Sequence, residues 1–174
     1  MIEVRLGEGR TTTYSPDGRL APESYDLSRL QLNQLTLVEK AVTDYSGTVT
    51  FYAPRNPQHV SYSTVNFQHN YATDTPHIEV PCTTFAELLT GIAPEQPQLV
   101  KLDIEGSEIA VIPQILGQPV LPPQLCIEFD ELGVPSERSA ANFAKTHSLL
   151  CQAGYRVAHF DGVSNFLYAQ GHLY

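Results

Sequence analysis

Basic residues are scarce in this chain. Ten lysines and arginines stand against nineteen aspartates and glutamates, which gives a formal net charge of −9 over 174 residues. A protein that binds nucleic acid non-specifically needs basic clusters that neutralise phosphates, so the sequence excludes that class. A binding surface for anionic lipid is excluded for the same reason, because no polybasic segment is present.

Long apolar runs and a cysteine framework are also missing. No apolar run approaches the roughly 20 residues that span a bilayer, and the polar, alternating start MIEVRLGEGR is not a signal peptide. The three cysteines are odd in number and widely spaced, which indicates small buried side chains in a reducing compartment. We therefore expect a cytoplasmic protein, and the length indicates a single domain over residues 1–174.

Segments with the patterns of strands and helices alternate along most of the chain. The final segments, YRVAHF and VSNFLYA on either side of Asp161-Gly162, predict a hairpin with a two-residue turn. This order predicts an α/β fold with a mostly parallel sheet and a C-terminal antiparallel hairpin. Helices are predicted over 24–35 and after the capping residues Thr84, Ser107 and Ser136. The predicted strands cover residues 2–6, 36–42, 48–53, 78–82, 99–104, 125–129, 155–160 and 163–169.

The segment LVKLDIEGSEIAVI (99–112) carries the strongest functional signal. Its near-continuous apolar run predicts a strand that is covered on both faces. Asp103 and Glu105 follow at the carboxyl end of this strand, and Gly106 lets the backbone turn into a helix. Ligands of open parallel sheets bind just outside the carboxyl ends of the strands, so these two carboxylates are the first candidates for chemistry.

These residues and three other segments resemble the FkbM family of S-adenosylmethionine-dependent methyltransferases. VKLDIEGSEI (100–109) matches the family pattern Lys-x-Asp-x-Glu-Gly-x-Glu, and the supporting segments are LVEKAVTDYSGTVTFY (37–52), SYST (61–64) and IEVPCTTFAELL (78–89). The resemblance covers residues 35–174 and leaves 1–34 as an atypical N-terminal segment. It implies a Rossmann-like class I methyltransferase sheet that is apparently missing its first strand or strands, because no glycine-rich cofactor turn is found.

The resemblance also implies an activity and a site. The expected reaction is methyl transfer from S-adenosylmethionine to a hydroxyl of a small metabolite or sugar. Asp103 and Glu105 would be catalytic, because the acceptor hydroxyl must lose its proton as the methyl group arrives. Ala41 and Val42, together with Asp103 and Gly106, would bind the cofactor, with the first two against its adenine edge. No metal is expected.

A second class of function stays open at this point. The chain could be a non-catalytic remnant or interaction module of the methyltransferase fold, or a fragment that another chain completes. An exposed sheet edge would then allow homodimerisation. The aromatic side chains of Tyr62, Phe67 and Tyr71 fit either a lid over a substrate or packing of the long polar loop 54–77, with packing favoured.

The acidic residues have structural interpretations as well. Asp103 could cap the following helix, and Glu108 could be stabilised in its first turn by the helix dipole or could contact substrate. Glu128 lies in an apolar strand, and pairing with Lys101 on the neighbouring strand would satisfy it. The carboxylates at the two strand ends also have the oxygen ligands that a divalent cation prefers, although nothing in their spacing demands one: Asp103, Glu105, Glu128 and Asp130.

Overall fold

A computed structural model of the chain describes residues 11–14, 20–23, 36–57, 61–72, 74–92 and 97–171. The chain divides into two compact units, Met1–Val38 and Glu39–Tyr174. The first unit contains a two-stranded antiparallel sheet formed by β1 (Thr11–Tyr14) and β2 (Leu20–Glu23). The predicted strand 2–6 and the predicted helix 24–35 lie outside the described residues.

The second unit holds a three-stranded sheet with the order β3-β5-β4. The central strand β5 (His77–Thr84) pairs in parallel with β3 (Ala41–Thr43) and antiparallel with β4 (Gly47–Tyr52). The predicted strand 36–42 is therefore wrong in its bounds. Residues 36–40 are exposed and outside any strand, so their apolar pattern has no sheet to pack on.

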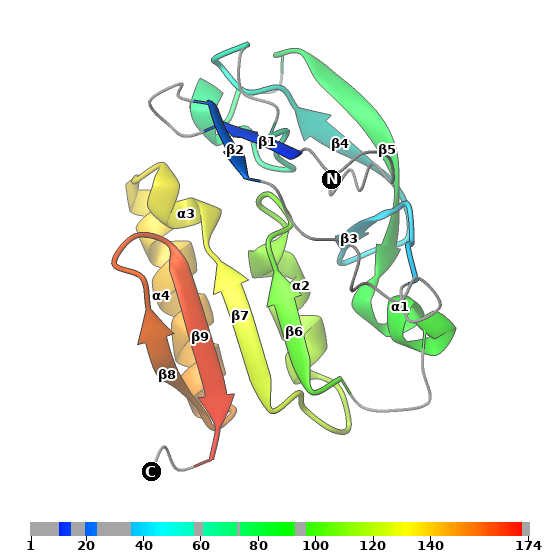
Figure 1. Cartoon of the computed structure of the whole chain (residues 1–174), viewed down its shortest axis with the longest axis vertical. Helices are drawn as coiled ribbons and strands as arrows, with labels where there is room; N and C mark the ends of the chain where they lie inside the picture. Colours follow the sequence, from blue (N-terminus) through cyan, green and yellow to red (C-terminus); the bar gives the residue numbers. More distant parts are fainter. Residues whose placement is uncertain are drawn as a thin grey trace. The chain divides into compact units, whose positions relative to one another are not determined.

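The second unit also holds a four-stranded sheet with the order β6-β7-β9-β8 (Figure 1). β6 (Leu99–Leu102) runs parallel to β7 (Gln124–Glu128), whereas β9 (Asn165–Gln170) is antiparallel to both β7 and β8 (Tyr155–Phe160). The α/β class is thus confirmed, and so is the final antiparallel hairpin, although residues 161–164 join its strands in place of the predicted two-residue turn. The expected single, mostly parallel sheet differs from this arrangement, because the described strands form separate sheets with parallel pairing only at β3–β5 and β6–β7.

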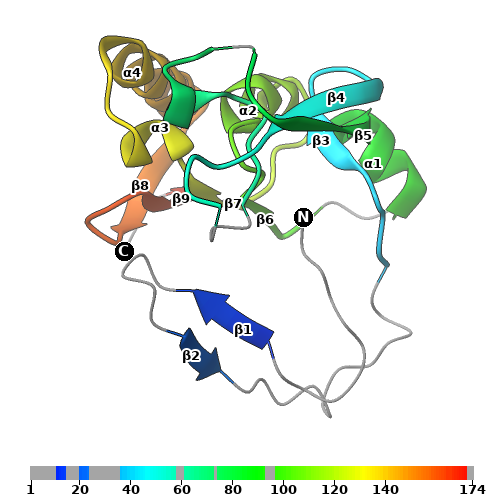
Figure 2. The same ribbon diagram turned by 90° about the horizontal axis from the view of Figure 1, so that it is seen from above.

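The described residues of the second unit include four α-helices and a short 3-10 helix, η3 (Phe67–His69), and two of the α-helices cover one face of the four-stranded sheet. α2 (Glu108–Leu116) and α4 (Glu137–Gln152) lie on the same side of its strands in both views (Figures 1 and 2). α1 (Phe85–Ile92) follows β5, and α3 (Asp130–Gly133) is a single turn after β7. The Gln114 side chain joins α2 to the three-stranded sheet and to α1, since it donates to the Thr43 carbonyl of β3 at 2.8 Å and accepts from the Phe85 amide at 3.3 Å.

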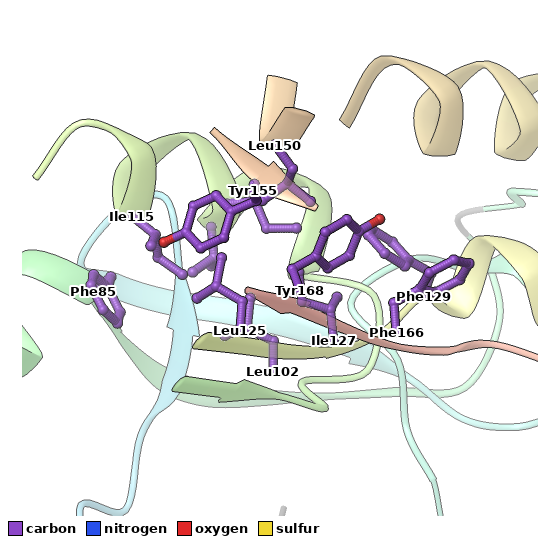
Figure 3. Close-up of a cluster of buried hydrophobic side chains, with 12 residues drawn as sticks. Phe85, Leu102, Ile115, Leu125, Ile127, Phe129, Leu150, Tyr155, Phe166 and Tyr168 are labelled. Carbon is purple, nitrogen blue, oxygen red and sulfur yellow. The ribbon is translucent and has the colours of Figure 1, made fainter. Parts of the chain in front are cut away.

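The hydrophobic core lies between this sheet and α2 and α4 (Figure 3). Side chains alternate along each strand, so Leu125 and Ile127 of β7 are fully buried while Gln124 is exposed. Tyr155 and Tyr168 are also buried, and their hydroxyls bond the Pro122 carbonyl at 2.6 Å and His147 Nδ1 at 2.7 Å. Each buried hydroxyl therefore has a partner, as burial of a polar group requires.

One face of β6 is buried in this core and the other is exposed. Leu102 is 4% exposed, but Leu99 is 54% exposed, and Lys101 and Asp103 on the same face are also exposed. The predicted burial of this strand on both faces is therefore wrong. In the described part of the chain, no helix is both long and apolar enough to cross a membrane.

Candidate functional site

The candidate site begins at the turn that links β6 to α2, residues 103–106, here called the acidic turn. Glu105 and Gly106 both have a positive φ, +56° and +95°, and this left-handed region is costly for a residue with a side chain. The Glu108 side chain holds the turn from the helix side. Its carboxylate accepts the amide of Ile104 at 2.7 Å and the amide of Gly106 at 3.0 Å. Glu108 is 1% exposed, so its position in the motif serves the backbone of the turn.

The segment of residues 61–65, after β4, packs on the other side of the acidic turn. The Ser63 hydroxyl and the Thr64 amide each donate to the Glu105 carbonyl at 2.8 Å. A Cβ atom added to Gly106 would lie 2.7 Å from Ser63 Oγ and 3.2 Å from Val65 Cγ2, which is too close. Glycine is therefore required at position 106 both by its backbone conformation and by this close approach.

Ser107 differs from the predicted helix cap. It stands at the N-cap position of α2, but its side chain makes no capping hydrogen bond. Its hydroxyl donates to Thr64 Oγ1 at 3.1 Å and so adds another contact to the same segment. The cap predicted at Ser136 is confirmed, because Ser136 Oγ accepts the Ser139 amide at 3.0 Å.

Carboxylates from the ends of β6 and β7 converge beside the acidic turn. Burial raises the pKa of Glu105, a hydrogen bond from the Ser61 side chain lowers it, and the charges of Asp103 and Glu128 raise it. Like charges that disfavour ionisation must lie close to one another. The charge of Asp103 therefore acts on the carboxyl of Glu105, the other catalytic residue predicted from the sequence.

Asp130, the first residue of α3, belongs to the same group. Burial, followed by the charges of Glu105, Glu131, Glu128 and Asp103, raises the pKa of Asp130 to about 7. We call these five carboxylates the acidic cluster. The sequence signal for Asp130 was that a second apolar strand also ends on acids, and the structure brings the two strand ends together through the parallel β6–β7 pair.

Two buried acids show that the surroundings favour a proton or a positive charge. Glu131 is 2% exposed, its Oε2 has no hydrogen-bond partner, and burial raises its pKa. Burial and then the charge of Asp130 raise the pKa of Glu108 to about 8, while the Ile104 amide lowers it. Unpaired buried oxygens and mutually repelling carboxylates would both gain from a cationic partner.

Asp103 has a different environment, because it is exposed and forms an ion pair with Lys101. The expected pairing of Lys101 with Glu128 is therefore wrong. Lys101 pairs with Asp103, which follows it by two residues in the sequence. Glu128 instead accepts a hydrogen bond from the Ser164 hydroxyl at 3.2 Å. The charge of Asp103 is thus partly compensated at the surface, where an ion pair contributes little to stability.

The residues predicted to contact adenine lie on the other sheet. Ala41 and Val42 are half-buried in β3, where they pair with Cys82 and Thr83 of β5, and Val42 also packs against the core. Gln114 connects this strand to α2 through the Thr43 carbonyl. Their contact with a cofactor stays a prediction.

Two aromatic residues of the long loop, Phe67 and Tyr71, pack on the protein, as the sequence favoured, and the role of Tyr62 stays a prediction. Phe67 is 5% exposed and meets Tyr71 edge to face, with 5.4 Å between ring centroids. The Tyr71 hydroxyl lies 3.3 Å from Ser136 Oγ, and the Arg138 guanidinium carbon lies over the Tyr71 ring, 4.4 Å from its centroid. The loop thus reaches the start of α4 (Figure 2). Among the described residues, no three His, Cys, Asp or Glu side chains are grouped so as to hold a metal ion.

Comparison with known families decides the assignment. A family model described as "Methyltransferase FkbM domain" matches residues 12–157. The chain belongs to the FkbM methyltransferase family. Neither the curated proteins nor the solved structures that were compared include a match. The match starts at residue 12, so it includes much of the segment 1–34 that the sequence patterns set apart as atypical.

Membership gives the acidic turn its chemical context. FkbM methyltransferases use S-adenosylmethionine as co-substrate, and the family implies a Rossmann-like methyltransferase fold. The motif residues 101–108 that carried the resemblance are the residues that form the end of β6, the acidic turn and the start of α2. The homodimer expected through a sheet edge stays a prediction.

Proposed function

We propose that this chain transfers a methyl group from S-adenosylmethionine to a hydroxyl of a small metabolite or sugar. The observation that carries the proposal is the acidic turn, which places the half-buried Glu105 carboxylate beside Asp103 at the carboxyl end of β6. In this proposal the described residues contain part of the Rossmann-like class I fold, namely strands β3, β6 and β7 and helices α1, α2 and α4.

The chemistry of the acidic cluster fits a cofactor that carries positive charge. S-adenosylmethionine has a sulfonium and an ammonium group, and when bound it supplies an electrophilic methyl group. Burial and then repulsion from neighbouring carboxylates raise the pKa of Asp130, and a cationic group near the cluster would offset both effects. The buried Oε2 of Glu131, which lacks a hydrogen-bond partner, would also gain from such a group. We assign Asp103 and Gly106 to the cofactor, with Ala41 and Val42 against its adenine edge.

Glu105 is the group that we assign as general base. Burial raises the pKa of its carboxyl, so it is a stronger base than an exposed glutamate. The acceptor hydroxyl would donate its proton to the Glu105 carboxylate as the oxygen–methyl bond forms. Asp103 beside it would orient the acceptor and keep the local field negative.

The experiment measures S-adenosylhomocysteine formed by the purified chain with a panel of sugars and small hydroxylated metabolites. Glu105→Gln should lower the rate by about 100-fold with the acceptor that reacts, because a general base contributes 10²–10⁴-fold. Glu79→Gln is the control, since Glu79 is an exposed acid of β5 that bonds Thr50 away from the turn. Equal rates for Glu105→Gln and the control would contradict the assignment of the base.

The second candidate, a non-catalytic interaction module, has its own support. Lys101 pairs with Asp103 and partly compensates its charge, and Glu108 is occupied by two backbone amides. Under this alternative the acidic turn is only a structural connection between β6 and α2. A folded chain that binds no S-adenosylmethionine would favour it.

A further inference from the structure

We propose that Ser61, Ser63 and Thr64 are positioning residues that hold the Glu105 carboxylate in its reactive orientation. This inference rests on the proposed function, because it assigns to these residues a role through the base named there. Residues 61–64, here called the serine segment, contact Glu105 at both its main chain and its side chain. The segment lies 41 to 44 residues earlier in the sequence, so the contact is tertiary.

The main-chain part of the contact fixes one peptide unit from two sides. Ser63 Oγ and the Thr64 amide donate to the carbonyl oxygen of Glu105, each at 2.8 Å. The amide of the next residue, Gly106, donates to the Glu108 carboxylate at 3.0 Å. The peptide between Glu105 and Gly106 is thus held at its oxygen by the serine segment and at its nitrogen by α2.

Fixing this peptide sets the direction of the Glu105 side chain. The φ of Glu105 is +56°, a conformation that costs about 1–2 kcal/mol for a residue with a Cβ atom. Without donors on its carbonyl, the residue would gain by turning back to an ordinary conformation, and its carboxylate would then leave the neighbourhood of Asp103. An orientation error of this kind lowers catalytic rates strongly even when the fold persists.

The side-chain part of the contact tunes the carboxylate itself. The Ser61 side chain hydrogen-bonds the Glu105 carboxyl and lowers its pKa against the effect of burial. Ser61 is exposed, so its hydroxyl contributes little to the core.

The serine segment is itself anchored to the rest of the second unit. Ser63 forms an isolated antiparallel bridge with Tyr52 of β4, with N–O distances of 2.8 and 3.1 Å. Farther along, Asn70 and Tyr71 have positive φ values, and the Tyr71 ring packs under Arg138 of α4. The loop is therefore fastened to β4 and to α4, and between these points it fixes the acidic turn.

The test begins with a readout that needs no activity. The pKa of the Glu105 carboxyl is measured by NMR titration of side-chain carboxyl carbons in the unaltered chain and in Ser61→Ala, Ser61→Thr and Ser148→Ala. Ser61→Ala should raise the pKa of Glu105, because a donor to the carboxylate is lost, and Ser61→Thr should restore it. Ser148 is the matched control, because it is an exposed serine of α4 whose hydroxyl accepts a hydrogen bond from the Gln152 side chain at 3.0 Å. An unchanged pKa in Ser61→Ala would overturn the side-chain part of the proposal.

Kinetics of S-adenosylhomocysteine formation test the main-chain part. Ser63→Ala should lower kcat about tenfold while the KM for S-adenosylmethionine changes less than twofold, because the base is misplaced and the cofactor contacts remain. Ser148→Ala should match the unaltered chain. Equal kcat values for Ser63→Ala and Ser148→Ala would overturn the proposal. A chain that does not bind S-adenosylmethionine at all would refute the proposed function, and the pKa of Glu105 in Ser61→Ala would still decide whether the contact exists.

Discussion

Replacing Gly106 with alanine tests the construction of the acidic turn. The new Cβ would meet Ser63 Oγ at 2.7 Å and both Thr64 Oγ1 and Val65 Cγ2 at 3.2 Å, and φ at this position is +95°. The conformational part costs about 1–2 kcal/mol, and forcing a carbon into a packed site costs about 1–3 kcal/mol more. We expect Gly106→Ala to lower the free energy of unfolding by about 3 kcal/mol.

Gly154→Ala separates the two contributions. Gly154 follows α4 with a φ of +91°, nearly the same as Gly106, but a Cβ there would meet nothing within 4 Å. It should therefore carry the conformational cost alone, about 1–2 kcal/mol. The gain from a less flexible unfolded chain is the same in both variants and cancels in the comparison.

Urea unfolding followed by circular dichroism measures both variants under the same conditions. The difference between them reports the contact with the serine segment. Adding Ser63→Ala to Gly106→Ala removes the nearest atom, so the double variant should lose about 1 kcal/mol less than the sum of the single variants. Equal destabilisation by Gly106→Ala and Gly154→Ala, together with additive behaviour in the double variant, would refute the close approach of the segment.

Further predictions concern the buried acids and assembly. Asp130 has a pKa of about 7 in the folded chain against an ordinary value of 3.8, so the folded state binds its proton more tightly than the unfolded state. The free energy of unfolding should therefore fall as the pH rises from about 4 to 7, and Asp130→Asn should flatten this fall in thermal melts; an unchanged slope would contradict it. Glu108→Gln should cost about 1–3 kcal/mol in urea unfolding, because an amide has one acceptor oxygen for the two backbone amides that Glu108 binds, and a loss below about 0.5 kcal/mol would argue against that role. β3 and β6 are edge strands among those described, and dimerisation through such an edge should give a dimer mass in sedimentation, whereas a monomer would contradict it.

Local signals in the sequence predicted several elements correctly. The hairpin around Asp161 forms as expected, but four residues join β8 to β9, so the predicted two-residue turn is wrong. The Asp161 carboxylate accepts the amides of Val163, Ser164 and Asn165 and so closes this longer turn. The capping position of Ser136 is also confirmed, as is the order of strand, acidic turn and helix at residues 99–116. Each of these depends on residues that are close together in the chain.

Features that depend on distant contacts could not be predicted in the same way. Nothing near Glu105 indicates that a serine 42 residues earlier donates to its carbonyl. The apolar run at Leu99 also predicted burial on two faces, because hydrophobicity alone does not say how many layers cover a strand. The side chain of Glu108 returns to the amides of its own turn, and the sequence left that choice open between the helix dipole and a substrate.

Binding of S-adenosylmethionine tests the central claim most directly. Calorimetric titration of the purified chain, shown to be folded by circular dichroism, should detect binding. Asp103→Asn should raise the Kd about tenfold, because a charged partner of the cofactor is lost. Ser148→Ala should bind as the unaltered chain does. An absence of heat at millimolar S-adenosylmethionine, or equal affinities for Asp103→Asn and Ser148→Ala, would contradict the assignment of the acidic turn as the cofactor and methyl-transfer site.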